Sequence, residues 1–314
     1  MSDTRLRVAI TTSSFGRVST EPLEKLESAG IEVAMNPHGR KTTAEELVKL
    51  AKGCQGIIAG TETYDESIFE TLADLEVVSR VGVGLDSIDE TAAERRGVAI
   101  LNTPGTHIDS VAEIALAGIL DLKRRLAFCD RLVRLKRWDK QIGSLLRGSI
   151  VGIIGTGHVG RRLVELLQPF RCEFRFFDAV QDPHFAADSG GAYCDLATLL
   201  SASEIVTVHL PLNEETRNLI GPKEFELLQP NAILVNTSRG GLLDEAGLLE
   251  WLRANPQASA YIDTFESEPY DGLLADLDNV LLSPHVGGQT SQGRMAMECG
   301  AVENLLKHFS LARV

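Results

Sequence analysis

The chain has 314 residues, 44% of them hydrophobic and 24% charged, which is typical of a folded protein and excludes disorder as its main state. Asp and Glu number 44 against 31 Lys and Arg, a formal net charge of −13. A chain this acidic does not bind nucleic acid or anionic lipid through bulk charge. No apolar run approaches the ~18 residues of a membrane span, and the run at residues 114–120 is only seven long.

The cysteines and histidines give no sign of a disulfide framework or a metal site. The histidines form no His-Glu-x-x-His motif, and the cysteines form no Cys-x-x-Cys pair. An odd number of widely spaced cysteines is typical of reduced thiols. Because residues 1–7 also lack the apolar core of a secretory signal, we expect a cytoplasmic protein without a metal. The five cysteines are Cys54, Cys129, Cys172, Cys194 and Cys299.

The first hundred residues alternate short apolar segments with amphipathic ones. Apolar strands that alternate with helices predict a parallel sheet covered on both faces, here one small doubly wound domain. A capping box can begin the second helix at either Thr42 or Thr43. Strands are expected at residues 8–12, 31–35, 56–59, 77–80 and 98–101, and helices at 21–29, 44–52, 66–72 and 89–96.

A long helix is expected at about residues 109–136, after which the alternation restarts. Six further strands are predicted, the number found in a dinucleotide-binding domain. The predicted fold class is therefore α/β, with two doubly wound parallel-sheet domains, one flavodoxin-like and one of the Rossmann type. The six strands are expected at residues 150–154, 173–177, 205–209, 232–235, 259–263 and 280–283, and a last helix at about 290–311.

The strand predicted at residues 150–154 runs into a Gly-x-Gly-x-x-Gly motif that opens a helix. In this context Gly155 permits a tight turn, Gly157 lets the backbone approach a pyrophosphate, and Gly160 lets the helix pack on the strand. The amides at the start of the helix, at the positive end of its dipole, would hold the phosphate charge. A glycine-rich turn of purely structural use is the alternative interpretation.

Asp178 ends the following strand, 18 residues after Gly160. An acid in this position binds the adenine ribose hydroxyls in dinucleotide-binding folds. No basic residue follows it at residues 179–181, which favours NAD over NADP. The sequence therefore predicts an NAD site.

Three late loops, each after a predicted strand, carry Arg239, Glu268 and His285. Loops after the carboxyl ends of parallel strands converge on one edge of the sheet, so we expect these side chains to lie together. His285 can exchange a proton near neutral pH, Glu268 can stabilise its charged form, and Arg239 can grip a carboxylate with its planar fork. A hydroxyacid–ketoacid oxidoreductase needs these groups beside a nicotinamide, whereas any one of them alone would be interpreted as structural.

Together these motifs resemble those of the D-isomer-specific 2-hydroxyacid dehydrogenases, most nearly the phosphoglycerate dehydrogenase-like branch. The resemblance covers nearly the whole chain and includes residues 80–86, 102–105, 110–113 and 209–212. It implies an enzyme that transfers a hydride between NAD and a small 2-hydroxy or 2-keto acid. Its catalytic residues would be Arg239, Glu268 and His285.

The resemblance also implies which residues contact the ligands. The substrate carboxylate would bind the backbone amides of Val83 and Gly84, and Arg80 matches a basic position associated with the substrate phosphate. Protonated His285 would supply the proton during reduction, and neutral His285 would be the base for oxidation. Asp263 would contact the nicotinamide amide. The full set of cofactor contacts would be Gly155, Gly157, His158, Val159, Gly160, Asp178, Thr237 and Asp263.

In the architecture that the resemblance implies, residues 1–102 and 286–314 form the substrate-binding domain and residues 103–285 form the NAD-binding domain. The cleft between the domains would open and close as ligands bind. The chain ends 29 residues after His285, so we do not expect the regulatory C-terminal domain of some phosphoglycerate dehydrogenases, or serine feedback through it.

The substrate remains open between two kinds of acid. The pair 3-phosphoglycerate and 3-phosphohydroxypyruvate is the first choice and would place the enzyme in serine biosynthesis. The phosphoglycerate enzymes, however, often carry an Arg just after the third strand, where this chain has Gly60, and Glu62 would repel a phosphate if its side chain faces the pocket. The alternative is a small unphosphorylated acid such as hydroxypyruvate or glyoxylate, with formate and phosphite less favoured. From another class, the alternative is an NAD(H)-sensing binding protein.

Residues 123–147 contain nine basic residues and only two acids, in contrast to the acidic chain as a whole. A solvated helix face is one interpretation. In the family that the chain resembles, this segment is part of the dimer contact, which predicts a homodimer with Trp138 buried across the interface. Cations such as Lys136, Arg137 and Lys140 could then supply the phosphate-binding charge that Gly60 lacks.

Overall fold

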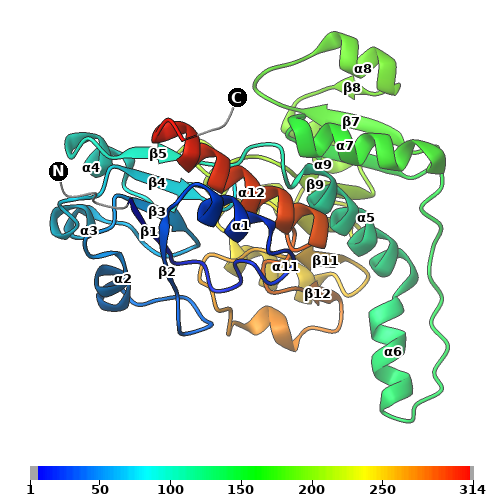
Figure 1. Ribbon diagram of the computed structural model, residues 1–314. Helices are drawn as coiled ribbons and strands as arrows, with labels where there is room; N and C mark the ends of the chain where they lie inside the picture. Colours follow the sequence, from blue (N-terminus) through cyan, green and yellow to red (C-terminus); the bar gives the residue numbers. More distant parts are fainter. Residues whose placement is uncertain (1–5, 312–314) are drawn as a thin grey trace, which may run out of the picture. The chain divides into compact units, whose positions relative to one another are not determined.

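A computed structural model of the chain describes residues 6–311 (Figure 1). The chain divides into two compact units. The first unit comprises Met1–His107 and Gln289–Val314, and the second comprises Ile108–Gly288. The first unit is therefore built from both ends of the sequence, and the second from one continuous stretch.

The first unit is a parallel sheet with helices on both faces. Among its described residues, five strands lie in the order β2-β1-β3-β4-β5, which is the flavodoxin-like order of an open α/β sheet. The strands are β1 (Arg7–Ile10), β2 (Glu32–Met35), β3 (Gly56–Ala59), β4 (Val77–Arg80) and β5 (Ala99–Leu101). The helices are α1 (Glu21–Ser28), α2 (Ala44–Ala51), α3 (Glu66–Thr71), α4 (Glu90–Arg95) and α12 (Ser291–His308).

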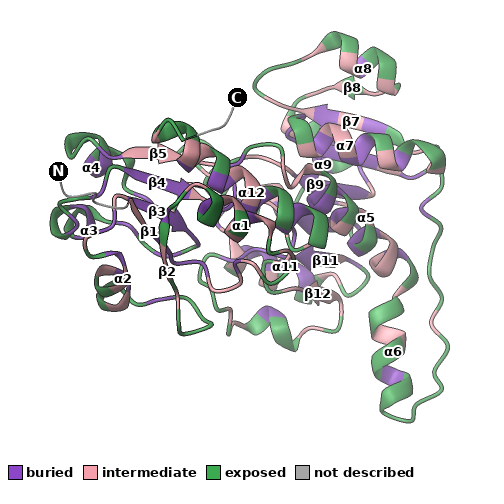
Figure 2. Ribbon diagram, in the orientation of Figure 1, coloured by how far each residue is buried: buried purple, intermediate pink, exposed green. Residues whose placement is uncertain are grey.

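Two apolar cores cover the two faces of this sheet. Side chains of α2, α3 and α4 pack with Ile57 and Val78 on one face, and those of α1 and α12 pack with Ile58 and Val77 on the other. Successive strand residues thus point to opposite faces, and both faces are buried. Figure 2 shows buried residues along β1, β3 and β4. The sequence reads as unbroken apolar runs for this reason.

The start of α2 resolves the two possible capping residues. The side chain of Thr43 accepts a hydrogen bond from the Glu46 amide at 3.3 Å, and the Thr43 amide donates to Glu46 Oε2 at 2.9 Å. This reciprocal pair satisfies amides that the first turn leaves without helical partners. Thr43, rather than Thr42, is therefore the residue that caps the helix.

The second unit, all of whose residues are described, contains a seven-stranded parallel sheet in the order β12-β11-β10-β9-β6-β7-β8. The order reverses between β6 and β9, as in the Rossmann fold. Six of these strands match the prediction, and the two-residue edge strand β8 was missed because it is too short to show a pattern. The strands are β6 (Ile150–Ile154), β7 (Glu173–Phe177), β8 (Ala192–Tyr193), β9 (Ile205–Val208), β10 (Ile233–Asn236), β11 (Ser259–Ile262) and β12 (Val280–Leu282).

The helix expected at about residues 109–136 is broken into two, so that prediction is wrong. Arg125 adopts a left-handed backbone with φ of 53° between α5 and α6. Asp121 accepts a hydrogen bond from the Ala127 amide at 2.7 Å, and the Arg125 guanidinium lies over the Phe128 ring. These local contacts restart the helix in a new direction. The helices of this unit are α5 (Ile108–Arg124), α6 (Leu126–Arg134), α7 (His158–Leu167), α8 (Pro183–Ser189), α9 (Leu196–Ala202), α10 (Pro222–Phe225) and α11 (Glu245–Ala254).

Helices cover both faces of the second sheet as well. Side chains of α5, α7 and α8 form one core with the strands, and those of α9, α10 and α11 form the other. The predicted fold class, two doubly wound parallel α/β units, is thus confirmed. Within residues 6–311, no helix combines the length and the apolar character that a bilayer crossing requires.

Candidate functional site

The glycine motif lies in the turn between β6 and α7. Gly155 has φ of +96°, and a Cβ atom there would lie 2.6 Å from the carbonyl oxygen of His209. A Cβ atom at Gly160 would lie 2.1 Å from the carbonyl oxygen of Gly155. Both positions therefore need glycine for the turn itself.

Gly157 differs, because a Cβ atom there would meet nothing within 4 Å. Gly157 is the N-cap of α7 and provides no side-chain cap. The amides of His158 and Val159, in the first turn, lack helical acceptors and lie at the positive end of the helix dipole. The open side of the motif thus has the features of an anion site.

Asp178, the residue after β7, lies against this turn. Its Oδ2 accepts hydrogen bonds from the Thr156 amide at 2.6 Å and from Thr156 Oγ1 at 3.0 Å. Its Oδ1 accepts one from the Val180 amide at 3.0 Å. The acid and the glycine motif, 18 residues apart in the chain, therefore form one continuous surface at the carboxyl ends of β6 and β7.

Glu268 and His285 lie on the loops that follow β11 and β12. His285 Nδ1 is 3.0 Å from Glu268 Oε2 and 3.1 Å from Oε1. Burial opposes ionisation of Glu268, but the hydrogen bond and the charge of His285, together with the charge of Arg239, outweigh it and hold the pKa of Glu268 below its usual value. Because an ionised carboxylate only accepts, Nδ1 carries a hydrogen and Nε2 is left to exchange a proton.

Arg239 lies on the loop after β10. Its Nη1 donates to the Ser238 carbonyl at 2.7 Å, and its own carbonyl accepts from Asn236 Nδ2 at 2.8 Å. A Cβ atom at Gly240 would lie 2.0 Å from the backbone of Phe265, so this loop packs directly on the loop that carries Glu268. The three loops are thus neighbours, as their adjacent strands require.

Asp263 is fully buried at the end of β11 and is bound to the His285 loop. Its carboxylate accepts hydrogen bonds from the amides of Val286 and Gly287 at 2.9 and 2.8 Å and from the Ser283 hydroxyl. His285 itself has φ of 53°. The buried carboxylate therefore holds this strained loop in place. Sequence reasoning did not find this anchoring role, because no local pattern links residues 263 and 283–287.

Thr237, a predicted cofactor contact on the loop after β10, is 5% exposed. Its Oγ1 atom is buried, and no hydrogen-bond partner is present for it among the described residues. A buried hydroxyl without a partner is uncommon, and this one is able to hydrogen-bond to a water or a ligand group.

The predicted substrate residues of the first unit lie at the end of β4. Arg80 Nη1 donates to the Val81 carbonyl, and a Cβ atom at Gly82 would lie 3.1 Å from Arg80 Nη1. The turn that contains Val83 and Gly84 is fixed from the side, because Asn102 Nδ2 donates to the Val83 carbonyl at 2.8 Å. The Arg80 guanidinium therefore lies against the turn of its own chain.

Glu62 is buried at the end of the neighbouring strand, with 3% of its surface exposed. Its Oε2 accepts hydrogen bonds from the Gly60 amide at 2.8 Å and from Thr11 Oγ1 at 2.9 Å. A Cβ atom at Gly60 would lie 2.8 and 2.9 Å from the two carboxylate oxygens. The carboxylate thus fills the space that a side chain at position 60 would occupy.

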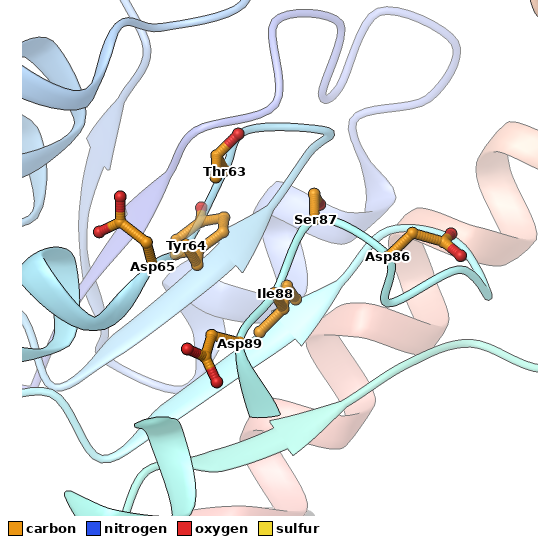
Figure 3. Close-up of a pocket in the computed structure, with 7 residues that line it drawn as sticks. All are labelled: Thr63, Tyr64, Asp65, Asp86, Ser87, Ile88 and Asp89. Atoms are coloured by element: carbon orange, nitrogen blue, oxygen red, sulfur yellow. The ribbon is translucent and has the colours of Figure 1, made fainter. Parts of the chain in front are cut away.

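A hollow of about 510 Å³ opens between the loops that follow β3 and β4 (Figure 3). The side chains of Asp65 and Asp89 cap α3 and α4, accepting from the Ile68 amide at 3.1 Å and the Ala92 amide at 2.9 Å. Figure 3 shows the carboxyl groups of Asp65, Asp86 and Asp89 well apart. Among residues 6–311, no three His, Cys, Asp or Glu side chains are placed to hold a metal ion.

A phosphate turn with an acid beside it, and an Arg, a Glu and a His on adjacent loops, are the parts of a dinucleotide-dependent oxidoreductase. A family model described as "D-isomer specific 2-hydroxyacid dehydrogenase, NAD binding domain" matches residues 116–287. The chain belongs to this family. It is an NAD-dependent dehydrogenase of D-2-hydroxy acids.

Relatives and solved structures agree with this assignment. The dehydrogenase is 35% identical to glyoxylate reductase of Thermococcus litoralis over 256 residues, 78% of this chain and 77% of that protein. It is 33% identical to D-3-phosphoglycerate dehydrogenase of Archaeoglobus fulgidus over 283 residues, 88% of this chain but 53% of that protein. The crystal structure of the TT0316 protein from Thermus thermophilus matches with a TM-score of 0.89 and 28% identity, covering 97% of both chains.

The residues of the second unit fit the NAD that this dehydrogenase uses. Gly157 leaves open space above the turn, and the first amides of α7 have no side-chain cap. These amides suit a pyrophosphate, and Asp178 suits a ribose hydroxyl. When bound, NAD accepts or supplies the hydride of the reaction.

Proposed function

We propose that the dehydrogenase reduces a small unphosphorylated 2-ketoacid, with glyoxylate or hydroxypyruvate as its substrate. Several of the proteins it matches are named for this chemistry, including the glyoxylate reductase of Thermococcus litoralis and the hydroxypyruvate reductase of Thermotoga maritima. The second of these is 30% identical over 300 residues, 92% of this chain and 97% of that protein. This reverses the order of preference that the sequence suggested, in which 3-phosphoglycerate came first.

The observation that carries this choice is the buried carboxylate of Glu62. Its carboxyl group lies where a side chain at position 60 would begin, so the Arg that is often present there in phosphoglycerate enzymes would fit only if Glu62 moved. The carboxyl group of Glu62 also offers a phosphate no positive charge to pair with. A substrate with a hydrogen or a hydroxymethyl group in place of the phosphorylated hydroxymethyl group avoids both problems.

We assign the chemical steps to the three loop residues of the second unit. Arg239 holds the substrate carboxylate with its planar guanidinium and polarises the adjacent carbonyl. His285 Nε2 gives a proton to the carbonyl oxygen as reduction proceeds and takes it back in oxidation. Glu268, hydrogen-bonded to Nδ1 at 3.0 Å, orients the ring and stabilises its protonated form.

Further ligand contacts are proposed on both units. The amides of Val83 and Gly84 in the first unit would hold the substrate carboxylate, which makes that unit the substrate-binding domain. The glycine motif, with His158, Val159 and Asp178, would hold the pyrophosphate and adenosine of NAD, and Thr237 would complete the nicotinamide end. The support is the open, uncapped start of α7 and the buried, unpartnered Thr237 hydroxyl.

One observation favours 3-phosphohydroxypyruvate, and with it a place in serine biosynthesis, as the second candidate. Arg80 is a basic residue at the end of β4, next to the turn proposed to bind the substrate carboxylate. The likeness to the phosphoglycerate dehydrogenase of Archaeoglobus fulgidus is compatible with this reading. Arg80 is held against its own turn, however, and Glu62 lies at the end of the neighbouring strand.

We also propose that the dehydrogenase is a homodimer that pairs through α6 and the following segment. This part projects from the rest of the second unit (Figure 1) and carries an unusual amount of exposed apolar surface. Apolar patches of this kind mark protein–protein contacts. The exposed side chains are Leu126 (67% exposed), Val133 (52%), Leu135 (66%), Trp138 (81%), Ile142 (96%) and Leu145 (72%).

The cytoplasm is the compartment that we propose, and the free thiols support it. All five cysteines lie among the described residues, and none is paired in a disulfide. Unpaired cysteines are usual in a reducing compartment.

The test is NADH oxidation by the purified protein with glyoxylate, hydroxypyruvate and 3-phosphohydroxypyruvate side by side. We expect efficient turnover of one of the first two acids and poor turnover of the phosphorylated one. The Arg239→Ala variant should lose activity with every acid while still binding NADH. Tight NADH binding without turnover of any ketoacid would instead support the NAD(H)-sensing alternative.

A further inference from the structure

A chain of hydrogen bonds crosses the second unit from the edge strand β8 to the glycine motif. The Tyr193 hydroxyl lies 2.8 Å from Thr156 Oγ1, which lies 3.0 Å from Asp178 Oδ2. Thr156 stands between the first two glycines of the motif and is 3% exposed. No sequence pattern links Tyr193 to the other two residues, because β8 is too short to predict.

The direction of these hydrogen bonds follows from the chemistry of the groups. The ionised carboxylate of Asp178 can only accept hydrogen bonds, so the Thr156 hydroxyl must donate its single hydrogen to that carboxylate. The Tyr193 hydroxyl must therefore donate to Thr156 Oγ1. A hydroxyl that accepts one hydrogen bond becomes a stronger donor in the next, so the bond from Tyr193 strengthens the bond from Thr156 to Asp178. The negative charge of Asp178 strengthens that second bond further.

Thr156 is held at all of its polar atoms. Its amide and hydroxyl bind Asp178, and its carbonyl accepts a hydrogen bond from Arg161 Nε at 2.8 Å. Arg161 is fixed in turn by Asp182 at 2.8 Å and lies 4.6 Å above the Phe185 ring. The position of Thr156 in the glycine motif is thus fixed by hydrogen bonds within the second unit, without a contribution from a ligand.

The hydrogen bonds from Tyr193 through Thr156 to Asp178, called the relay below, leave the Asp178 carboxylate few free acceptor sites for a ligand. An ionised carboxylate offers roughly four acceptor sites, of which the Thr156 amide, the Thr156 hydroxyl and the Val180 amide fill three. Both bonds from Thr156 fall on Oδ2, so the remaining site is on Oδ1. A single hydroxyl donor matches that vacancy.

Tyr193 is well placed to keep the relay rigid. Its ring packs against Phe176, a fully buried residue of β7, with a centroid separation of 5.5 Å. Phe176 also contacts Phe185 at 5.0 Å, beneath the Arg161 guanidinium. The tyrosine hydroxyl is therefore fixed to the core of the unit rather than free to rotate in solvent.

We propose that Tyr193 and Thr156 are positioning residues for NAD: they fix Asp178 so that its Oδ1 accepts one hydroxyl of the adenosine ribose. The inference rests on the proposed contact between Asp178 and the ribose. Neither residue touches the reacting atoms. The relay therefore acts on the affinity for the cofactor and not on the chemical step.

The experiment is a fluorescence titration with NADH of the wild-type protein and of Tyr193→Phe, Thr156→Val, Thr156→Ser and Asp178→Asn. Loss of one hydrogen bond in the relay should weaken NADH binding about 3- to 10-fold in Tyr193→Phe, and loss of a charge-assisted bond about 10-fold or more in Thr156→Val. Thr156→Ser keeps the hydroxyl and should bind nearly as the wild type does. The kcat at saturating NADH should be unchanged in Tyr193→Phe.

A double-variant comparison separates positioning from a general effect on folding. If the relay acts through Asp178, Tyr193→Phe should add nothing further in a Thr156→Val or an Asp178→Asn background. Tyr64→Phe is the matched control, because it breaks another tyrosine–threonine hydroxyl contact, 3.0 Å to Thr11 in the first unit. That variant should leave NADH affinity unchanged.

Three results would overturn the relay. Unchanged NADH affinity in both Tyr193→Phe and Thr156→Val would contradict the relay. Losses of NADH affinity that add fully in the double variant would contradict it as well. NADH affinity equal to that of the wild type in Asp178→Asn would contradict both the proposed ribose contact and the relay. By contrast, a wild-type protein that binds NADH but reduces no ketoacid would refute the proposed function and leave the relay standing.

Discussion

His285 Nδ1 faces both carboxylate oxygens of Glu268, at 3.0 and 3.1 Å, although the two residues lie on loops that follow different strands. The His285 loop is held independently by the buried carboxylate of Asp263, through the amides of Val286 and Gly287. The imidazole is thus positioned from two sides. One carboxylate supports its ring, and the other supports its backbone.

The first prediction concerns the charge on Glu268. Glu268→Gln keeps a hydrogen-bond acceptor but removes the negative charge that stabilises the protonated imidazole. We expect kcat/KM for ketoacid reduction to fall about 10- to 100-fold, and the alkaline limb of the pH–rate profile to move to lower pH. NADH affinity should change little. Glu204→Gln is the control, because it removes another carboxylate of the second unit, paired with Lys123 at 3.1 Å, and should leave the pH profile in place.

The second prediction concerns stability in acid. The hydrogen bond and charge of Arg40, with the Thr43 amide, lower the pKa of Glu46 to about 2. A carboxyl with a depressed pKa in the folded state contributes stability that is present above its ordinary value, 4.5, and lost as the pH falls toward 2. We expect Tm to drop less steeply between these pH values in Glu46→Gln than in the wild type. Parallel Tm curves for the two proteins would contradict this linkage.

The sequence was sufficient to predict those parts of the fold and site that depend on local pattern. Twelve strands are present among the described residues, and eleven of them were predicted because each is a short apolar run bounded by turns. The rule that loops meet at the carboxyl ends of parallel strands is enough to predict that Glu268 and His285 lie together. Likewise, the position of Asp178 at the end of the strand after the glycine motif predicts that it lies beside that motif.

What the sequence could not predict depends on contacts between distant residues. The break at Arg125 lies inside an unbroken helical pattern, and a side-chain contact from Asp121 to the Ala127 amide restarts the helix. The link from Tyr193 to Thr156 spans 37 positions and joins an edge strand to the phosphate turn. Glu62 is a charged residue whose type alone would suggest exposure, yet it is 3% exposed and accepts hydrogen bonds from the Gly60 amide and from Thr11 Oγ1, 51 positions away.

The third prediction concerns the proposed dimer. Ile142 is 96% exposed in the segment after α6, so a charge at this position stays in water in the monomer but would be buried, at a cost, in the proposed dimer. Ile142→Asp should shift the protein toward the monomer in sedimentation velocity at micromolar concentration. Leu273→Asp is the control, since Leu273 is 53% exposed elsewhere in the second unit, and it should leave the oligomeric state unchanged. A wild-type protein that sediments as a monomer would contradict the dimer itself.

The fourth prediction separates two glycines of one motif. Gly157→Ala places a methyl group where nothing lies within 4 Å, on a backbone that any residue adopts. It should leave Tm within about 1 °C of the wild type, since an exposed and unstrained substitution costs little, yet weaken NADH binding at least about tenfold because the pyrophosphate must approach that backbone. Gly160→Ala places its methyl 2.1 Å from the Gly155 carbonyl oxygen and should lower Tm by several degrees. Calorimetry and NADH titration of both variants check this, and equal losses of Tm in the two would show that Gly157 serves the fold rather than the cofactor.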